Sequence, residues 1–216
     1  MKFGQSLSFM IQEENWVKKL LVATGFAVLS PLVIGEVILL GWIIGIARNV
    51  IHNKEQKLPS WAKMGEIVKD GFKGLGIILI WYLPCFVLLL IPAIPTILET
   101  FLDPSQIAQF FFNPKIVNSF FTIAALYGIF AYIMAICALG VFARSQSFKK
   151  ALNPSVVFLC FLANKKRYLL TAVFAIFFCS FMIIFGASLC LIGSFPVWAY
   201  TATVLGHIFG QACSDQ

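Results

Sequence analysis

Long apolar runs, separated by short charged segments, dominate this chain. About 20 apolar residues form a helix long enough to cross a hydrocarbon core of about 30 Å. Only 12% of the residues are charged and 60% are hydrophobic, whereas soluble domains are roughly a quarter charged and half apolar. The pattern predicts an all-α, polytopic helical membrane protein, a single membrane domain over residues 1–216 with about five transmembrane helices. The expected spans are Leu20–Ala47, Gly74–Ile94, Ile116–Val141, Tyr168–Ile192 and residues 197–212.

The first run, Leu20–Ala47, is longer than one crossing requires and contains Ser30-Pro31 near its middle. As one helix it would be about 42 Å long, and proline kinks or breaks a helix. Two full crossings would need about 40 residues. We therefore favour a single kinked, tilted span. The alternative is a re-entrant hairpin bent at Pro31, which would return the N-terminus to the cytoplasmic side.

Positive charge is concentrated in two loops, residues 48–73 and 144–167, each with six Lys or Arg residues. Loops rich in Lys and Arg remain on the cytoplasmic side of a membrane, so both are expected to be cytoplasmic. The segment around Lys115 and a turn at "GSFP", residues 193–196, are then expected outside. The net charge of +7 comes mainly from the loops between apolar runs and not from one folded face. Membrane topology therefore explains this charge better than nucleic-acid binding does.

The segment "LPSWAKMGEIVKDGFKGL" has the pattern of a short amphipathic helix. Trp61, Met64, Val68 and Phe72 recur at spacings of three and four, which defines one apolar face. Trp beside lysines is typical of a helix lying in the membrane interface. The alternative is a cytoplasmic helix packed on the underside of the bundle. A further short interfacial helix is expected after Asp103-Pro104.

The second basic loop repeats the plan of the first. In "GVFARSQSFKKALNPSVVFLCFLANKKRYLL" an arginine ends a span, and a Pro-Ser pair, an apolar segment and a basic cluster follow. The spacings nearly match those around Pro59-Ser60. We interpret residues 20–94 and 116–192 as two copies in the same orientation, a parallel repeat of a kind found in membrane proteins, with an extra C-terminal span at 197–212.

Several motifs resemble a known family. "NWVKKLL", "LGWIIGIAR", "KLPSW" and "GEIVKDGFKGLGIILIWYLP" are similar to DUF4013, an uncharacterised prokaryotic family of multi-span membrane proteins. The resemblance is clearest over residues 15–95 and weaker elsewhere, including "GHIFGQ". It implies a small protein of a bacterial or archaeal cell membrane. It implies no substrate, cofactor or catalytic residue.

Glu36 is the acidic residue that falls inside a predicted span. Charges at membrane depth are costly and often functional. Glu36 lies five residues after Pro31, where broken helix geometry exposes a side chain to water or an ion. It is a candidate proton or cation site. Alternatively, it is a hydrogen-bonded or protonated glutamate that braces a kink.

His207 is the histidine inside a predicted span, and glycines flank it in "GHIFG". A neutral imidazole can ligate the metal of a tetrapyrrole, but a second histidine for such a ligand set is missing at this depth. The simpler alternative is a histidine that packs and hydrogen-bonds between helices. Gly41, Gly45, Gly206 and Gly210 form two small-xxx-small motifs that allow helix backbones to approach closely.

Sets of catalytic residues and paired metal-binding cysteines are absent from the sequence. We therefore expect no enzyme, no metal site and no cofactor. The leading hypothesis is a noncatalytic membrane component, an accessory or scaffolding subunit that contacts lipid and either a membrane-protein partner or further copies of itself. The alternative is a small transporter or channel subunit that uses Glu36 at a broken first helix.

Overall fold

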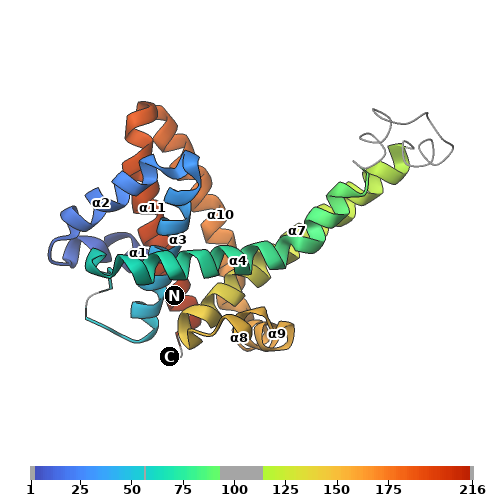
Figure 1. Cartoon of the computed structure of the whole chain (residues 1–216), viewed down its shortest axis with the longest axis horizontal. Helices are drawn as coiled ribbons and strands as arrows, with labels where there is room; N and C mark the ends of the chain where they lie inside the picture. The colour runs from blue at the N-terminus through green and yellow to red at the C-terminus, as the bar shows by residue number, and fades with distance from the viewer. Residues whose placement is uncertain (1–2, 56, 93–113, 215–216) are drawn as a thin grey trace.

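The computed structural model describes residues 3–55, 57–92 and 114–214 (Figure 1). In these residues all regular structure is helical, as the sequence predicts. The expected helix after Asp103-Pro104 lies outside the described residues. The elements are α1 (Phe3–Ser8), η1 (Phe9–Gln12), α2 (Trp16–Val28), η2 (Ser30–Leu32), α3 (Ile34–Ile51), η3 (Trp61–Lys63), α4 (Met64–Leu90), α7 (Pro114–Ser145), α8 (Phe148–Leu152), α9 (Pro154–Ala163), α10 (Lys165–Ser188) and α11 (Cys190–Cys213).

Four helical stretches in the described part of the chain are long and apolar enough to cross a membrane. They are Ile34–Ile51, Trp61–Leu90, Lys115–Ser145 and Lys165–Ser188. This confirms the polytopic, all-α class. Helix α11 covers the expected fifth span but is not among the four, because polar residues such as Thr201, His207 and Gln211 lower its hydropathy.

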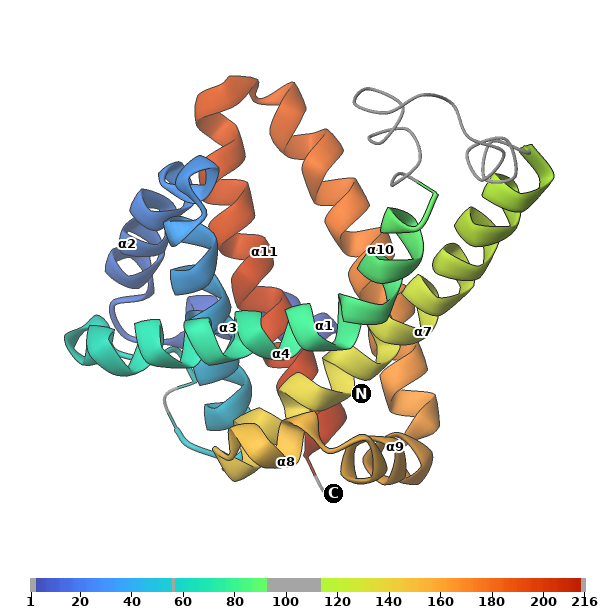
Figure 2. The ribbon, with the colours of Figure 1, turned by 45° about the vertical axis from the view of Figure 1, so that its right-hand side comes forward.

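The first apolar run is two helices, α2 and α3, and not one continuous kinked helix. Helix α2 ends at Val28, the chain turns through η2, and α3 leaves in a new direction (Figure 2). At this corner Val33 has a φ of 63°. Gly35 donates its N–H to the Leu29 carbonyl at 3.3 Å, and a Cβ on Gly35 would overlap the Phe26 carbonyl oxygen. The run therefore bends near Pro31 as the alternative interpretation expected, but α3 alone is long and apolar enough to cross a membrane, so the re-entrant path stays a prediction.

The predicted surface helix and the second span are one continuous helix, α4. It runs across α3 and then changes direction in its last turns (Figure 2), where Pro84 removes a helix hydrogen bond. Its buried residues are Ile67, Gly71, Gly74 and Ile77. The buried stripe therefore lies beside the predicted apolar face, and the side chain of Phe72 is 61% exposed.

Helices α3, α4 and α11 pack closely because glycines face backbone at their crossings. A Cβ on Gly41 would overlap the Ile67 carbonyl oxygen, and one on Gly71 would overlap that of Val37. Such contact brings α3 and α4 together without side chains between them. Around these crossings lie two apolar clusters, one containing Trp42 and the other Phe142.

Helices α10 and α11 form a second hairpin, and its turn differs from the prediction. The chain reverses at Leu189, and residues 193–196 already belong to α11. Gly186 allows the two helices to approach, because a Cβ there would lie 3.3 Å from the Cα of Ser194. The predicted turn at "GSFP" is therefore wrong by four residues.

Helices α4 and α7 form a third hairpin that projects from the packed centre (Figure 1). At its base, α8 and α9 carry the second basic loop, and Asn153 caps α9 by accepting the Ser155 N–H at 3.0 Å. A break at Asn164 separates α9 from α10, whereas α4 continues without one. The parallel repeat stays a prediction.

Candidate functional site

Glu36 lies in the first turn of α3, directly after the α2–α3 corner, and is half-buried. Trp198 of α11 donates its indole N–H to Glu36 Oε1 at 3.1 Å. The hydrogen bond joins α3 to α11 through two residues that are 162 positions apart in sequence. The carboxyl therefore has a fixed direction, which the sequence alone did not reveal.

A cavity of about 250 Å³ opens beside this carboxyl. Besides Glu36, its one other polar side-chain oxygen belongs to Thr201, which donates to the Val197 carbonyl at 2.8 Å. The carboxyl is thus the ionisable group among the lining residues of this cavity, and it can bind a proton, a cation or a hydrogen-bond donor. The lining residues are Val33, Glu36, Val37, Leu39, Leu40, Ile43, Leu75, Ile78, Trp198, Thr201, Ala202 and Leu205.

His207 lies against the N-terminal segment and away from Glu36's cavity. Its Nδ1 is 2.8 Å from Ser6 Oγ and 3.3 Å from Gln211 Nε2, and its ring stacks on Phe9 with centroids 4.1 Å apart. This geometry favours the interpretation that the histidine packs between helices. In the described residues no group of three or more His, Cys, Asp or Glu side chains is placed to hold a metal ion.

The glycines beside His207 are directed toward α3. A Cβ on Gly206 would lie 2.9 Å from the Ile43 carbonyl oxygen, and one on Gly210 would lie 2.9 Å from that of Ala47. They leave no room for a flat ring, because α3 fills the space beside them. Gly45, on α3, faces the Pro59 ring, whose Cγ would be 2.8 Å from an added Cβ.

The predicted interfacial residues, which lie in η3 and α4, do not share one environment. Trp61 donates its indole N–H to the Lys19 carbonyl at 3.0 Å and stacks on Trp42 with centroids 5.1 Å apart. Met64 and Val68 are half-buried against the same cluster, and Phe72 points outward. Trp61 therefore anchors the loop before α4 to the bundle.

A clasp made by Glu13 and Lys19 holds the first basic loop, and sequence reasoning missed it. Glu13 Oε1 accepts the N–H groups of Lys57 and Leu58, the latter at 2.8 Å. Glu13 Oε2 lies 3.2 Å from Lys19 Nζ, which also donates to the Leu58 carbonyl at 2.9 Å. The sequence signal that could have indicated it is an acidic residue near the pair Lys18-Lys19 in a chain with few charges.

Arg48 joins three helices, although its sequence position suggested only a topological charge. Its Nη1 lies 2.8 Å from Asp70 Oδ2 on α4. Its Nε donates to the Ala143 carbonyl on α7 at 3.4 Å. Side-chain exposures of 16% and 14% show that the Arg48–Asp70 pair is largely shielded from solvent.

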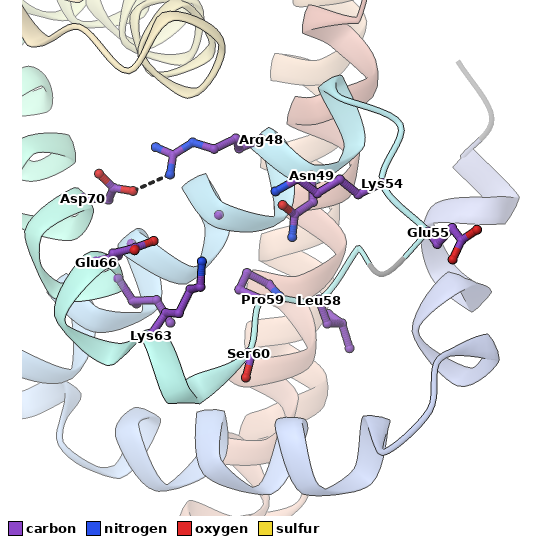
Figure 3. A pocket seen from close by; sticks show the side chains of 13 residues that line it. Arg48, Asn49, Lys54, Glu55, Leu58, Pro59, Ser60, Lys63, Glu66 and Asp70 are labelled. Carbon is purple, nitrogen blue, oxygen red and sulfur yellow. Dashed lines mark ion pairs between the residues drawn. The ribbon is translucent and has the colours of Figure 1, made fainter.

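Beside this ion pair lies a cavity of about 500 Å³, which we call the rim pocket (Figure 3). It is bounded by the second half of α3, the loop before η3 and the first turns of α4. The lining residues are Gly41, Gly45, Arg48, Asn49, Lys54, Glu55, Leu58, Pro59, Ser60, Lys63, Glu66, Ile67 and Asp70.

Comparison with protein families matches residues 24–192 to DUF4013, described as a protein of unknown function. The chain belongs to the DUF4013 family. The match covers Glu36, the Arg48–Asp70 pair and the rim pocket, whereas Glu13, Lys19 and His207 lie outside it. No curated protein and no solved structure matches the chain. DUF4013 membership therefore assigns no activity to these sites.

Proposed function

We propose that this chain is a noncatalytic component of the cell membrane, an accessory or scaffolding subunit that contacts other membrane proteins or lipid. The observation that carries the proposal is the apolar surface of α10 and of the α4–α7 hairpin. On α10, Phe177 and Ile184 are 72% and 71% exposed. On α7, Leu126 and Ile129 are 66% and 62% exposed.

The shape of the molecule supports this role. Helices α7 and α10 meet near their bases, where Tyr132 donates its hydroxyl to the Ala172 carbonyl at 3.5 Å. Beyond that point the two hairpins diverge (Figure 2). Apolar flanks of this kind pack against lipid tails or against the helices of another membrane protein.

Topology belongs to the same proposal, with loops 48–73 and 144–167 facing the cytoplasm. The N-terminal segment is attached to the first loop through Lys19 and Leu58. The C-terminal end is attached to the second, because Arg167 donates to the Ser214 carbonyl at 2.8 Å. Both ends of the described chain are therefore expected on the cytoplasmic side. A reporter fused to the C-terminus and active only in the cytoplasm tests this orientation.

The test of the subunit role is purification of the full chain from its native membrane in mild detergent. We expect a membrane protein to copurify at a fixed ratio, or the chain to form a defined homo-oligomer. Phe177→Ala with Ile184→Ala on α10 should reduce that association, and Leu126→Ala with Ile129→Ala tests the α7 face in parallel. A monomer that retains no partner and is unaffected by either double variant would contradict the proposal.

A second candidate function, a small transporter or channel subunit, is favoured by the Glu36 cavity. A carboxyl that an indole orients in an apolar cavity could exchange a proton or bind a cation. Reconstituted vesicles should then show an ion- or proton-dependent flux that Glu36→Gln abolishes. Trp198→Phe, which removes the hydrogen bond and keeps the carboxyl, should alter the flux without abolishing it. Vesicles without flux would remove this candidate.

A further inference from the structure

The rim pocket has charged side chains around its opening and a small, apolar floor. Gly41, Gly45 and Ile67 line the floor, where α3 and α4 cross. Lys54 belongs to the loop before η3, whereas Lys63 lies in η3, just before α4. Figure 3 shows Lys63 directed into the space between Glu66 and Pro59.

Two of the lining charges already neutralise each other. Arg48 and Asp70 form the ion pair at 2.8 Å, which leaves Lys54, Lys63 and Glu66 exposed and without an ion pair in the described part of the chain. Lys63 and Glu66 are three positions apart, a spacing at which helix side chains can pair, yet they remain separate. Glu55 is turned away from this opening (Figure 3) and also lines a neighbouring pocket.

Hydrogen bonds from residues around the rim pocket fix the loop before η3, which forms one of its walls. Asn49 donates to the Lys57 carbonyl at 3.0 Å. The Glu13–Lys19 clasp binds the backbone N–H and carbonyl of Leu58. Leu58 itself is 2% exposed and fixes the loop in the apolar cluster. A loop held in this way loses little conformational freedom when a ligand binds.

We infer that the rim pocket binds the headgroup of a phospholipid that carries both a phosphate and a primary ammonium. Lys54 and Lys63 provide two ammonium groups for the phosphodiester. Glu66 provides a carboxylate for the ligand's ammonium. The negative phosphodiester of the ligand then faces the two lysines, and its positive ammonium faces the carboxylate of Glu66.

Two further observations favour a lipid over a soluble phosphate ester. The floor is apolar, so it suits the glycerol and ester region that follows a lipid headgroup. The pocket also opens beside the start of Trp61–Leu90, one of the stretches long and apolar enough to cross a membrane. Its volume of about 500 Å³ is within the usual range of small-ligand sites, roughly 300–1,000 Å³. The inference does not rest on the proposed function, because a scaffold or a transporter could carry this site.

The test measures lipid bound to the full, detergent-purified chain by native mass spectrometry after titration with phosphatidylethanolamine. Lys54→Gln with Lys63→Gln should weaken binding about tenfold, because two charge-assisted hydrogen bonds are lost. The matched control is Lys18→Gln with Lys69→Gln, which removes the same charge from exposed lysines outside the pocket. The control should bind like the unmodified chain. Equal loss in both variants would overturn the inference, since it would indicate general surface attraction.

The second variant tests the ammonium side of the site. Glu66→Gln should reduce the preference for phosphatidylethanolamine over phosphatidylglycerol, which lacks the ammonium, while Glu14→Gln should leave it unchanged. Soluble glycerophosphoethanolamine, added in the same assay, should displace the lipid only weakly. Displacement at equal concentration would overturn the lipid assignment in favour of a soluble ester. Thermal unfolding of each variant checks that the fold is retained.

Discussion

Glu13 and Lys19 bind the same residue, Leu58, through its backbone N–H and its backbone carbonyl. The carboxylate accepts the Leu58 N–H at 2.8 Å, and the ammonium donates to the Leu58 carbonyl at 2.9 Å. The two side chains also pair with each other at 3.2 Å. The first basic loop is therefore fixed by Glu13, which precedes α2, and by Lys19 in the first turn of α2, and the shape of the rim pocket depends on both.

Removal of the Glu13 charge should loosen this loop. The Glu13 and Lys19 side chains are only 8% and 14% exposed, so Glu13→Gln should lower the free energy of unfolding by about 2 kcal/mol. Thermal unfolding in detergent measures the change. Glu14→Gln is the control, because Glu14 is exposed. Equal melting temperatures for the two variants would refute the structural role of the clasp.

The α3–α4 crossing should not tolerate a larger residue at Gly71. A methyl group there would overlap the Val37 carbonyl oxygen, so Gly71→Ala should cost about 1–3 kcal/mol through overpacking. Gly65→Ala on the same helix meets nothing within 4 Å and should leave stability unchanged or slightly higher. Chemical unfolding compares the two variants. A neutral Gly71→Ala would mean that the helices are farther apart than described.

Arg48 and Asp70 should be energetically coupled. A double-mutant cycle with Arg48→Gln and Asp70→Asn should give a coupling energy of about 1–2 kcal/mol. Arg48→Gln should cost more than Asp70→Asn, because Arg48 also donates to the Ala143 carbonyl. Pairing Arg48→Gln with Glu14→Gln provides a cycle that should be additive. A coupling energy of zero for Arg48 and Asp70 would contradict the ion pair.

His207 should serve to hold α1. His207→Leu removes one partner of Ser6 Oγ, to which Gln211 Nε2 also donates at 3.3 Å, so limited proteolysis should cut within residues 3–15 faster than in the unmodified chain. Ser6→Ala should have the same effect in a weaker form. Ser8→Ala is the control, since Ser8 donates to the Gly4 carbonyl within its own helix. Unchanged cleavage in His207→Leu would show that the contact does not anchor α1.

The sequence predicts the helical class and most of the spans because hydropathy is a local property. It does not decide the first run, since composition is the same for a kinked span and for a hairpin. The choice depends on contacts across the corner, such as Gly35 against Phe26. The same limit applies to the first predicted surface helix: only the packing of α4 against α3 shows that Gly71 is buried and Phe72 is exposed.

The candidate site was predictable in part. Glu36 stands out because an acidic residue in an apolar run is rare, but its partner Trp198 has no local signal. The sequence does not predict the rim pocket, and the reason is different. Its lysines have the distribution that membrane topology alone would produce, so their second use becomes visible only when η3 and α4 place Lys63 beside Glu66.

The contact between Ser6 and His207 joins positions 201 residues apart. Because a ribosome releases the chain from its N-terminus, α1 leaves it long before α11 has been made. Its binding surface does not exist until His207 and Gln211 have followed. The segment synthesised early is therefore fixed late, and the newly inserted bundle passes through a period in which α1 is undocked and Phe9 has no imidazole to cover it.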